Sequence, residues 1–119
     1  MGRGQGCAVD VLLLKLCLPG RPERGAGILL LDHERGHLYL RLREDWEQIA
    51  DPEDAVVLSA MSGHFHRQLE ELGNGGGAEF LRRLEDQLSN VLKLSQRRRI
   101  TVRDIATTID RLFDENCVS

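Results

Sequence analysis

The sequence predicts an α+β fold in which a three-stranded antiparallel sheet comes first and three helices then pack on one face of it. Up to residue 43, hydrophobic residues run continuously or alternate, as they do in strands. From residue 51 onward they recur at spacings of three and four, as they do in helices. With 119 residues, the chain has the length of one domain, 1–119, and its Gly-rich start, 1–7, is expected to be frayed.

The first strand is expected over 8–18, where apolar residues are nearly continuous, as in a strand covered on both faces. A loop rich in Pro and Gly separates it from a β-hairpin with arms at 26–32 and 37–43. In the second arm, leucine occupies every second position and alternates with polar or amphipathic side chains. This alternation predicts one face in the core and one in water.

The first helix is expected over 52–72, because a capping Asp51 and Pro52 precede an apolar stripe at helical spacing. The Gly-rich segment 73–77 predicts a helix connection. A second apolar stripe predicts a helix over 78–96.

The third helix is expected over 102–115. Thr101, with Asp104 three residues later, is typical of a capping box at a helix start. The apolar residues that follow again recur at helical spacing.

Composition narrows the class of protein. The chain is 41% hydrophobic and 29% charged, as in ordinary globular proteins. No apolar run approaches the roughly 20 residues that span a bilayer, so we expect a cytoplasmic protein without membrane contact. The three cysteines lie far apart in no CxxC spacing, which argues against a disulfide framework and against a zinc site.

Charge is unevenly distributed along the chain. Residues 44–78 hold one basic and eight acidic residues, within a chain whose net charge is −3. Of the 16 basic residues 14 are arginine; a GC-rich, bacterial genome and a need for bidentate recognition both account for such an excess. The acidic block 44–54 could meet a basic partner, or the arginine cluster of a second copy.

No pattern of catalytic residues is present. The serines of the predicted helices lack a nucleophile-elbow signature. The sequence "GNGGG" at 73–77 follows a helix and lacks the GK[ST] of a phosphate loop. We therefore expect neither an enzyme nor a bound cofactor.

A metal site ranks last among the predictions. His33 and His37 flank a turn and could approach each other, with Asp32 or Glu34 as an oxygen ligand. The histidines of the "HFH" at 64–66 lie two residues apart, a poor spacing for two ligands on one helix. Surface histidines near a turn are far commoner than metal ligands, so no metal is expected.

The arginine cluster Arg97, Arg98 and Arg99 falls between the second and third predicted helices. Cations there are stabilised by the exposed carbonyl groups of a helix C-terminus, which explains the cluster without a ligand. The alternative is contact with phosphate or with an acidic partner, which the geometry of Arg suits.

One resemblance bears on this alternative. The run "EFLRRLEDQLSNVLKLSQRRRITVRDIATTIDRLF" resembles the back half of a histone fold, in which a long helix, a basic loop with a Thr-containing cap and a short helix follow in this order. The resemblance implies that Arg99 and Thr101 lie in a DNA-facing loop, so that Thr101 could join the arginines in a contact with phosphate or an acidic partner.

Because neither catalysis nor a metal site is expected on these grounds, we look for function in surfaces that could bind a partner protein. Tyr39, Arg41 and Arg43 share the predicted wet face of the hairpin, and Trp46 follows directly. An exposed Trp would be a natural interface hot spot. We therefore expect a non-enzymatic protein–protein interaction module that forms a homodimer or binds another protein. Nucleic-acid binding through Arg97–Arg99 is the alternative, and metal or ligand binding ranks third.

Overall fold

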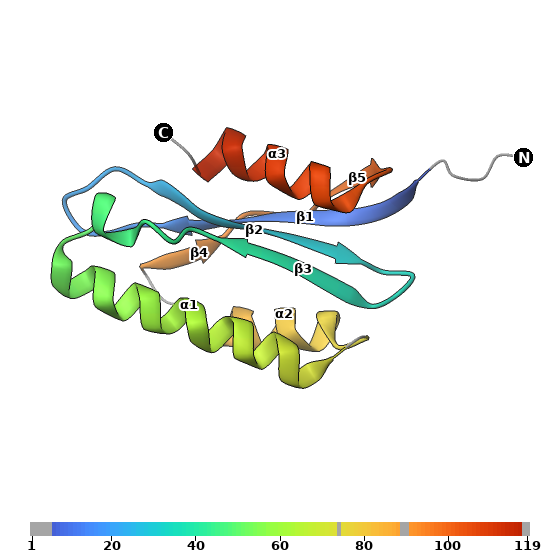
Figure 1. Ribbon diagram of the computed structural model, residues 1–119, viewed down its shortest axis with the longest axis horizontal. Coiled ribbons are helices and arrows are strands. Elements are labelled where there is room, and N and C mark those ends of the chain that lie inside the picture. Colours follow the sequence, from blue (N-terminus) through green and yellow to red (C-terminus); the bar gives the residue numbers. More distant parts are fainter. Residues whose placement is uncertain (1–5, 74, 89–90, 118–119) are drawn as a thin grey trace, which may run out of the picture.

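The computed structural model describes residues 6–73, 75–88 and 91–117, and it has an α+β fold (Figure 1). Five antiparallel strands form one sheet. Helices α1 (Pro52–Leu72) and α2 (Gly77–Gln87) cover one face of the sheet, and α3 (Ile105–Cys117) covers the other. The predicted class is confirmed, but the sheet has five strands instead of three, and the helices lie on both faces instead of one.

The sheet is built around β1 (Cys7–Leu16), which lies at its centre. β2 (Arg24–Asp32) pairs with one side of β1, and β3 (His37–Leu42) then forms one edge of the sheet. β4 (Leu92–Leu94) and β5 (Arg98–Val102) both pair with the other side of β1. Because both faces of β1 are covered, its nearly continuous apolar sequence is explained.

The predicted helix 78–96 is wrong in its second half, since α2 ends at Gln87 and β4 follows. The residues 91–94, "VLKL", suit the period of a strand as well as that of a helix. The unpaired side of β1 decides between the two, because a strand there completes the hydrogen bonds of the sheet.

β4 and β5 act as one edge strand interrupted by a bulge. Ser95 lies between them; its backbone N–H donates to the Leu13 carbonyl (2.9 Å), and its hydroxyl oxygen accepts from the Leu13 N–H (2.8 Å). The register with β1 shifts by one residue across this point, as a bulge requires. The arginine cluster therefore lies in a bulge and an edge strand, not between two helices as predicted.

The start of the third helix also differs from the prediction. α3 begins at Ile105, and its cap is Asp104, whose side chain accepts hydrogen bonds from the Thr107 N–H (3.3 Å) and the Thr107 hydroxyl (2.9 Å). Thr101, the predicted cap, lies inside β5. The run likened to a histone fold is thus a helix, two strands and a helix, so the helix–loop–helix that the resemblance implied is absent from its described residues.

The two layers of the core share β1 and β2. Side chains at every second position of β1 (Leu12, Leu14 and Leu16) pack with α1, α2 and Trp46 of the short 3₁₀ helix η1 (Trp46–Gln48). Val9 of β1 and Leu30 of β2 pack on the opposite side with α3. The first predicted helix, 52–72, has the same bounds as α1.

Candidate functional site

Two of the predicted interface residues are buried. Trp46 is 2% exposed and is part of the core beneath α1 and α2. Arg43 is 4% exposed; it donates to the carbonyl oxygens of Gly25 (3.2 Å) and Cys117 and pairs with Asp45 (2.9 Å). The Arg43 side chain thus fastens the end of α3 to β2, and neither residue has surface to offer a partner.

The other two predicted interface residues are engaged by α3. Arg41 forms an ion pair with Asp110, and its guanidinium lies 4.5 Å from the ring centroid of Phe113. Tyr39 is half-buried and packs edge-on against His37, with 4.4 Å between the ring centroids. The face of β3 that the sequence predicted to be wet is therefore largely covered by a helix.

An apolar surface lies instead on α1. Val56 and Val57 are 70% and 66% exposed, and no other large hydrophobic side chain in the described ranges is so exposed. A shallow hollow of about 560 Å³ lies beside Val56, and it is lined by Glu47, Pro52, Ala55, Val56, Ser59 and Ala60. Exposed apolar side chains beside a hollow are typical of an interaction surface.

The outward stripe of α1 carries charges at its two ends. Glu53, Ala60 and Arg67 are spaced by seven residues, so they lie on one side of the helix, about 10 Å apart along its axis. Val56 and Gly63 fall between them on the same side. Neither Glu53 nor Arg67 forms an ion pair within the described part of the chain. We refer to these five residues as the α1 stripe.

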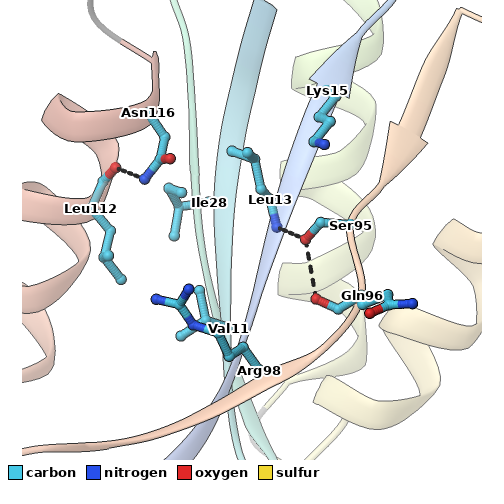
Figure 2. Close-up of a pocket in the computed structure, with 9 residues that line it drawn as sticks. All are labelled: Val11, Leu13, Lys15, Ile28, Ser95, Gln96, Arg98, Leu112 and Asn116. Atoms are coloured by element: carbon cyan, nitrogen blue, oxygen red, sulfur yellow. Dashed lines mark hydrogen bonds between the residues drawn. The ribbon is translucent and has the colours of Figure 1, made fainter.

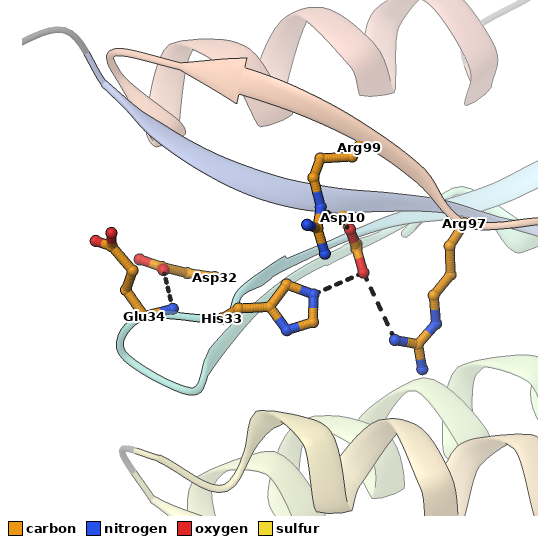
Figure 3. A network of polar contacts seen from close by, with 6 residues as sticks. All are labelled: Asp10, Asp32, His33, Glu34, Arg97 and Arg99. Atoms are coloured by element: carbon orange, nitrogen blue, oxygen red, sulfur yellow. Dashed lines mark hydrogen bonds and ion pairs between the residues drawn. The ribbon is translucent and has the colours of Figure 1, made fainter.

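Asp10 of β1 is the centre of a polar network on the face of the sheet that also carries α1 and α2 (Figure 3). Its carboxylate is nearly buried and contacts His33 Nε2 (2.7 Å), Arg99 Nε (3.1 Å) and Arg97 Nη1 (3.6 Å). Burial raises the pKa of Asp10, but the hydrogen bonds and charges of His33 and Arg99 outweigh burial, so the pKa lies below its ordinary value. The carboxylate is therefore ionised at neutral pH.

Three separate segments bring these partners to Asp10. His33 lies in the turn after β2, where the Asp32 carboxylate accepts a hydrogen bond from the Glu34 N–H (3.0 Å) and holds the turn. Arg97 comes from the bulge and Arg99 from β5, whose register places Arg99 opposite Asp10. The only sign of this network in the sequence is Asp10 itself, a single acid inside an apolar strand. Its partner Arg99 lies 89 residues away along the chain.

The arginine cluster is divided between the two faces of the sheet. Arg98 lies at a groove of about 370 Å³ between α3 and the β4–β5 edge, where Val11, Leu13 and Ile28 provide apolar surface (Figure 2). Arg97 and Arg99 point to the opposite face, toward Asp10. Thr101 follows Arg99 at the next same-face position of β5.

The histidines near the β2–β3 turn have different partners. His33 contacts Asp10, whereas His37 packs on Tyr39. Within residues 6–73, 75–88 and 91–117, no three His, Cys, Asp or Glu side chains gather to hold a metal ion. Over the same ranges, no helix is long and apolar enough to cross a membrane.

This chain matches no protein-family model, no curated protein and no solved structure.

Proposed function

We propose that this protein is a non-enzymatic assembly module that self-associates through the α1 stripe and the adjoining Val57. The observation that carries the proposal is the exposure of Val56 and Val57, side chains that α1 holds in water while its other side packs on the sheet. Burying a valine side chain fully contributes about 1.5 to 3 kcal/mol, so four valines at a two-fold interface supply a substantial driving force.

The charges of the α1 stripe are suited to a second copy in the antiparallel direction. If two α1 helices cross at Ala60, the Glu53 side chain of each copy lies opposite Arg67 of the other, because both residues are seven positions from the centre. The same arrangement brings Val56, four residues before the crossing, near Gly63, three residues after it. Gly63 has no side chain, and the guanidinium of Arg67 lies beside the space that one would fill. Such an interface is self-complementary, as two-fold dimers require.

Analytical ultracentrifugation over a range of protein concentrations tests the proposal. We expect the unaltered chain to form a dimer, and Val56→Asp to shift it to monomer because it places two like charges in the apolar centre. His66→Asp is the matched control, since it adds one negative charge at an exposed position of α1 outside the stripe. Equal effects of the two variants, or a monomer at every concentration, would contradict the proposal.

A charge exchange tests the antiparallel geometry separately. Glu53→Arg and Arg67→Glu should each weaken the dimer, because each places like charges opposite one another. The double variant E53R/R67E restores opposite charges, so it should dimerise like the unaltered chain. If the double variant does not dimerise, the antiparallel alignment is contradicted, but the proposal of self-association is not.

Nucleic-acid binding ranks second as a proposed function. Half-exposed Arg97 and Arg99 favour it. However, Asp10 neutralises part of their charge, and Arg98 points to the other face of the sheet, so the three arginines do not form one surface for a phosphate backbone.

A further inference from the structure

The network around Asp10 contains more positive than negative charge. One carboxylate faces two guanidinium groups and one imidazole, all within 3.6 Å of its oxygens. Figure 3 shows the Glu34 carboxylate directed away from this group, and Asp32 is occupied with the turn backbone. The acid of the network therefore balances only part of the charge that it gathers.

The two arginines also keep most of their hydrogen-bond donors unused. A guanidinium group has five N–H donors in a planar fork. Arg99 donates to Asp10 through Nε alone, and Arg97 approaches at 3.6 Å, longer than a hydrogen bond. Within the described part of the chain, the two guanidinium groups make no further hydrogen bonds. The Arg99 side chain is 64% exposed and the Arg97 side chain 45%. The free donors therefore face solvent.

Asp10 holds these two like charges side by side before any ligand arrives. Two guanidinium groups that lie two residues apart repel each other, and the nearly buried carboxylate offsets that repulsion and orients both forks. Groups that are fixed in advance lose less freedom on binding, which favours affinity. The exposed Thr101 hydroxyl lies farther along the same face of β5.

We infer that His33, Arg97 and Arg99, arranged by Asp10, form a binding site for a phosphate group. Phosphate fits better than carboxylate because it presents three strong acceptor oxygens and nearly two negative charges, enough for both forks. One carboxylate is already satisfied by one fork. The inference is independent of the α1 stripe, which lies on another element.

Isothermal titration calorimetry with pyrophosphate as the probe, at low ionic strength, tests the site. We expect measurable binding, and Arg97→Gln with Arg99→Gln should weaken it about tenfold or more, the loss of two charge-assisted contacts. The matched control is R98Q/R111Q, which also removes two positive charges but on the side of the sheet that carries α3. The control should change the affinity by less than about threefold, since only screened long-range charge is lost.

The outcomes separate the source of the phosphate. Binding of pyrophosphate and not of a single-stranded oligonucleotide supports a small phosphate-bearing ligand. Tighter binding of the oligonucleotide, lost in R97Q/R99Q and steeply dependent on salt, supports a nucleic-acid backbone at the same site. Equal losses in the two double variants, or no binding of either probe, would overturn the inference. All four altered arginines are exposed, so thermal unfolding of each variant should match that of the unaltered chain to within a few degrees.

Discussion

The two edges of the sheet carry the same short pattern, two arginines separated by one residue, and use it differently. At the β3 edge, Arg41 and Arg43 are bound to α3 and to its C-terminal end. At the β5 edge, Arg97 and Arg99 gather on one buried carboxylate and keep their remaining donors in solvent. The first pair holds α3 against the sheet, whereas the second pair has hydrogen-bond donors left over for a ligand.

The difference arises from what covers each edge. α3 crosses the face of β2 and β3, so the arginines of β3 meet the carbonyl groups and acids of a helix. On the face of β5 that carries Arg97 and Arg99, the arginines meet Asp10, which His33 of the β2–β3 turn also contacts, and no hydrogen bond or ion pair with a helix is found for them in the described part of the chain. An arginine pattern in the sequence therefore indicates function only when the elements packed on that strand are known.

The largest effect is expected at Arg43, where the pattern serves the fold. Arg43→Met keeps the apolar stem but leaves the Gly25 and Cys117 carbonyl oxygens without this donor and Asp45 without its partner. We expect the free energy of unfolding to fall by about 2 to 4 kcal/mol, because a buried charged donor is removed from its acceptors. Urea unfolding measures this. Arg99→Met at the opposite edge is the control, and a loss as large as that of R43M would erase the distinction between the edges.

The fold could be predicted from the sequence where local pattern and tertiary context agree. α1 has its predicted bounds because Pro52, an apolar stripe and a closing glycine all act within one helix. β1 was correctly expected to be covered on both faces. That expectation already conflicted with three helices on one face, and the placement of α3 resolves it.

Long-range pairing explains what the sequence did not reveal. The segment after α2 suits both helix and strand periods, and only the free side of β1, some eighty residues earlier, selects the strand. The same pairing brings Arg99 to Asp10, so this site could not be predicted from either residue's neighbours. Val56 and Val57 are different: they lie outside the apolar stripe of a helix whose bounds were predicted, so their exposure was readable from the spacing alone.

A second prediction concerns pH at the C-terminal end of α3. Burial of Cys117 raises the pKa of its thiol to about 11, from an ordinary value of 9.0. An unfolded chain therefore loses this proton before the folded one does, and stability should fall as the pH rises from about 9 to 11. The effect is at most about 2 to 3 kcal/mol, from two pKa units. Cys117→Ala should show a shallower decline in urea unfolding over this range; an unchanged slope would contradict the prediction.

The smallest effect is expected at the β5 edge, where Arg99 supports a charge but is itself exposed. Arg99→Gln should lower the free energy of unfolding at pH 7 by no more than about 1 kcal/mol, because the pair is partly screened and His33 still contacts Asp10. The pKa of Asp10 lies below its ordinary value of 3.8, so the stabilisation is present above that pH and is lost as the pH falls further. In urea unfolding, the difference between R99Q and the unaltered chain should therefore shrink as the pH falls below 3.8 and Asp10 is protonated. A difference that stays constant at low pH would show that Arg99 stabilises β5 by something other than its charge on Asp10. Arg99 would then belong with the arginines of β3, whose main role is in the fold.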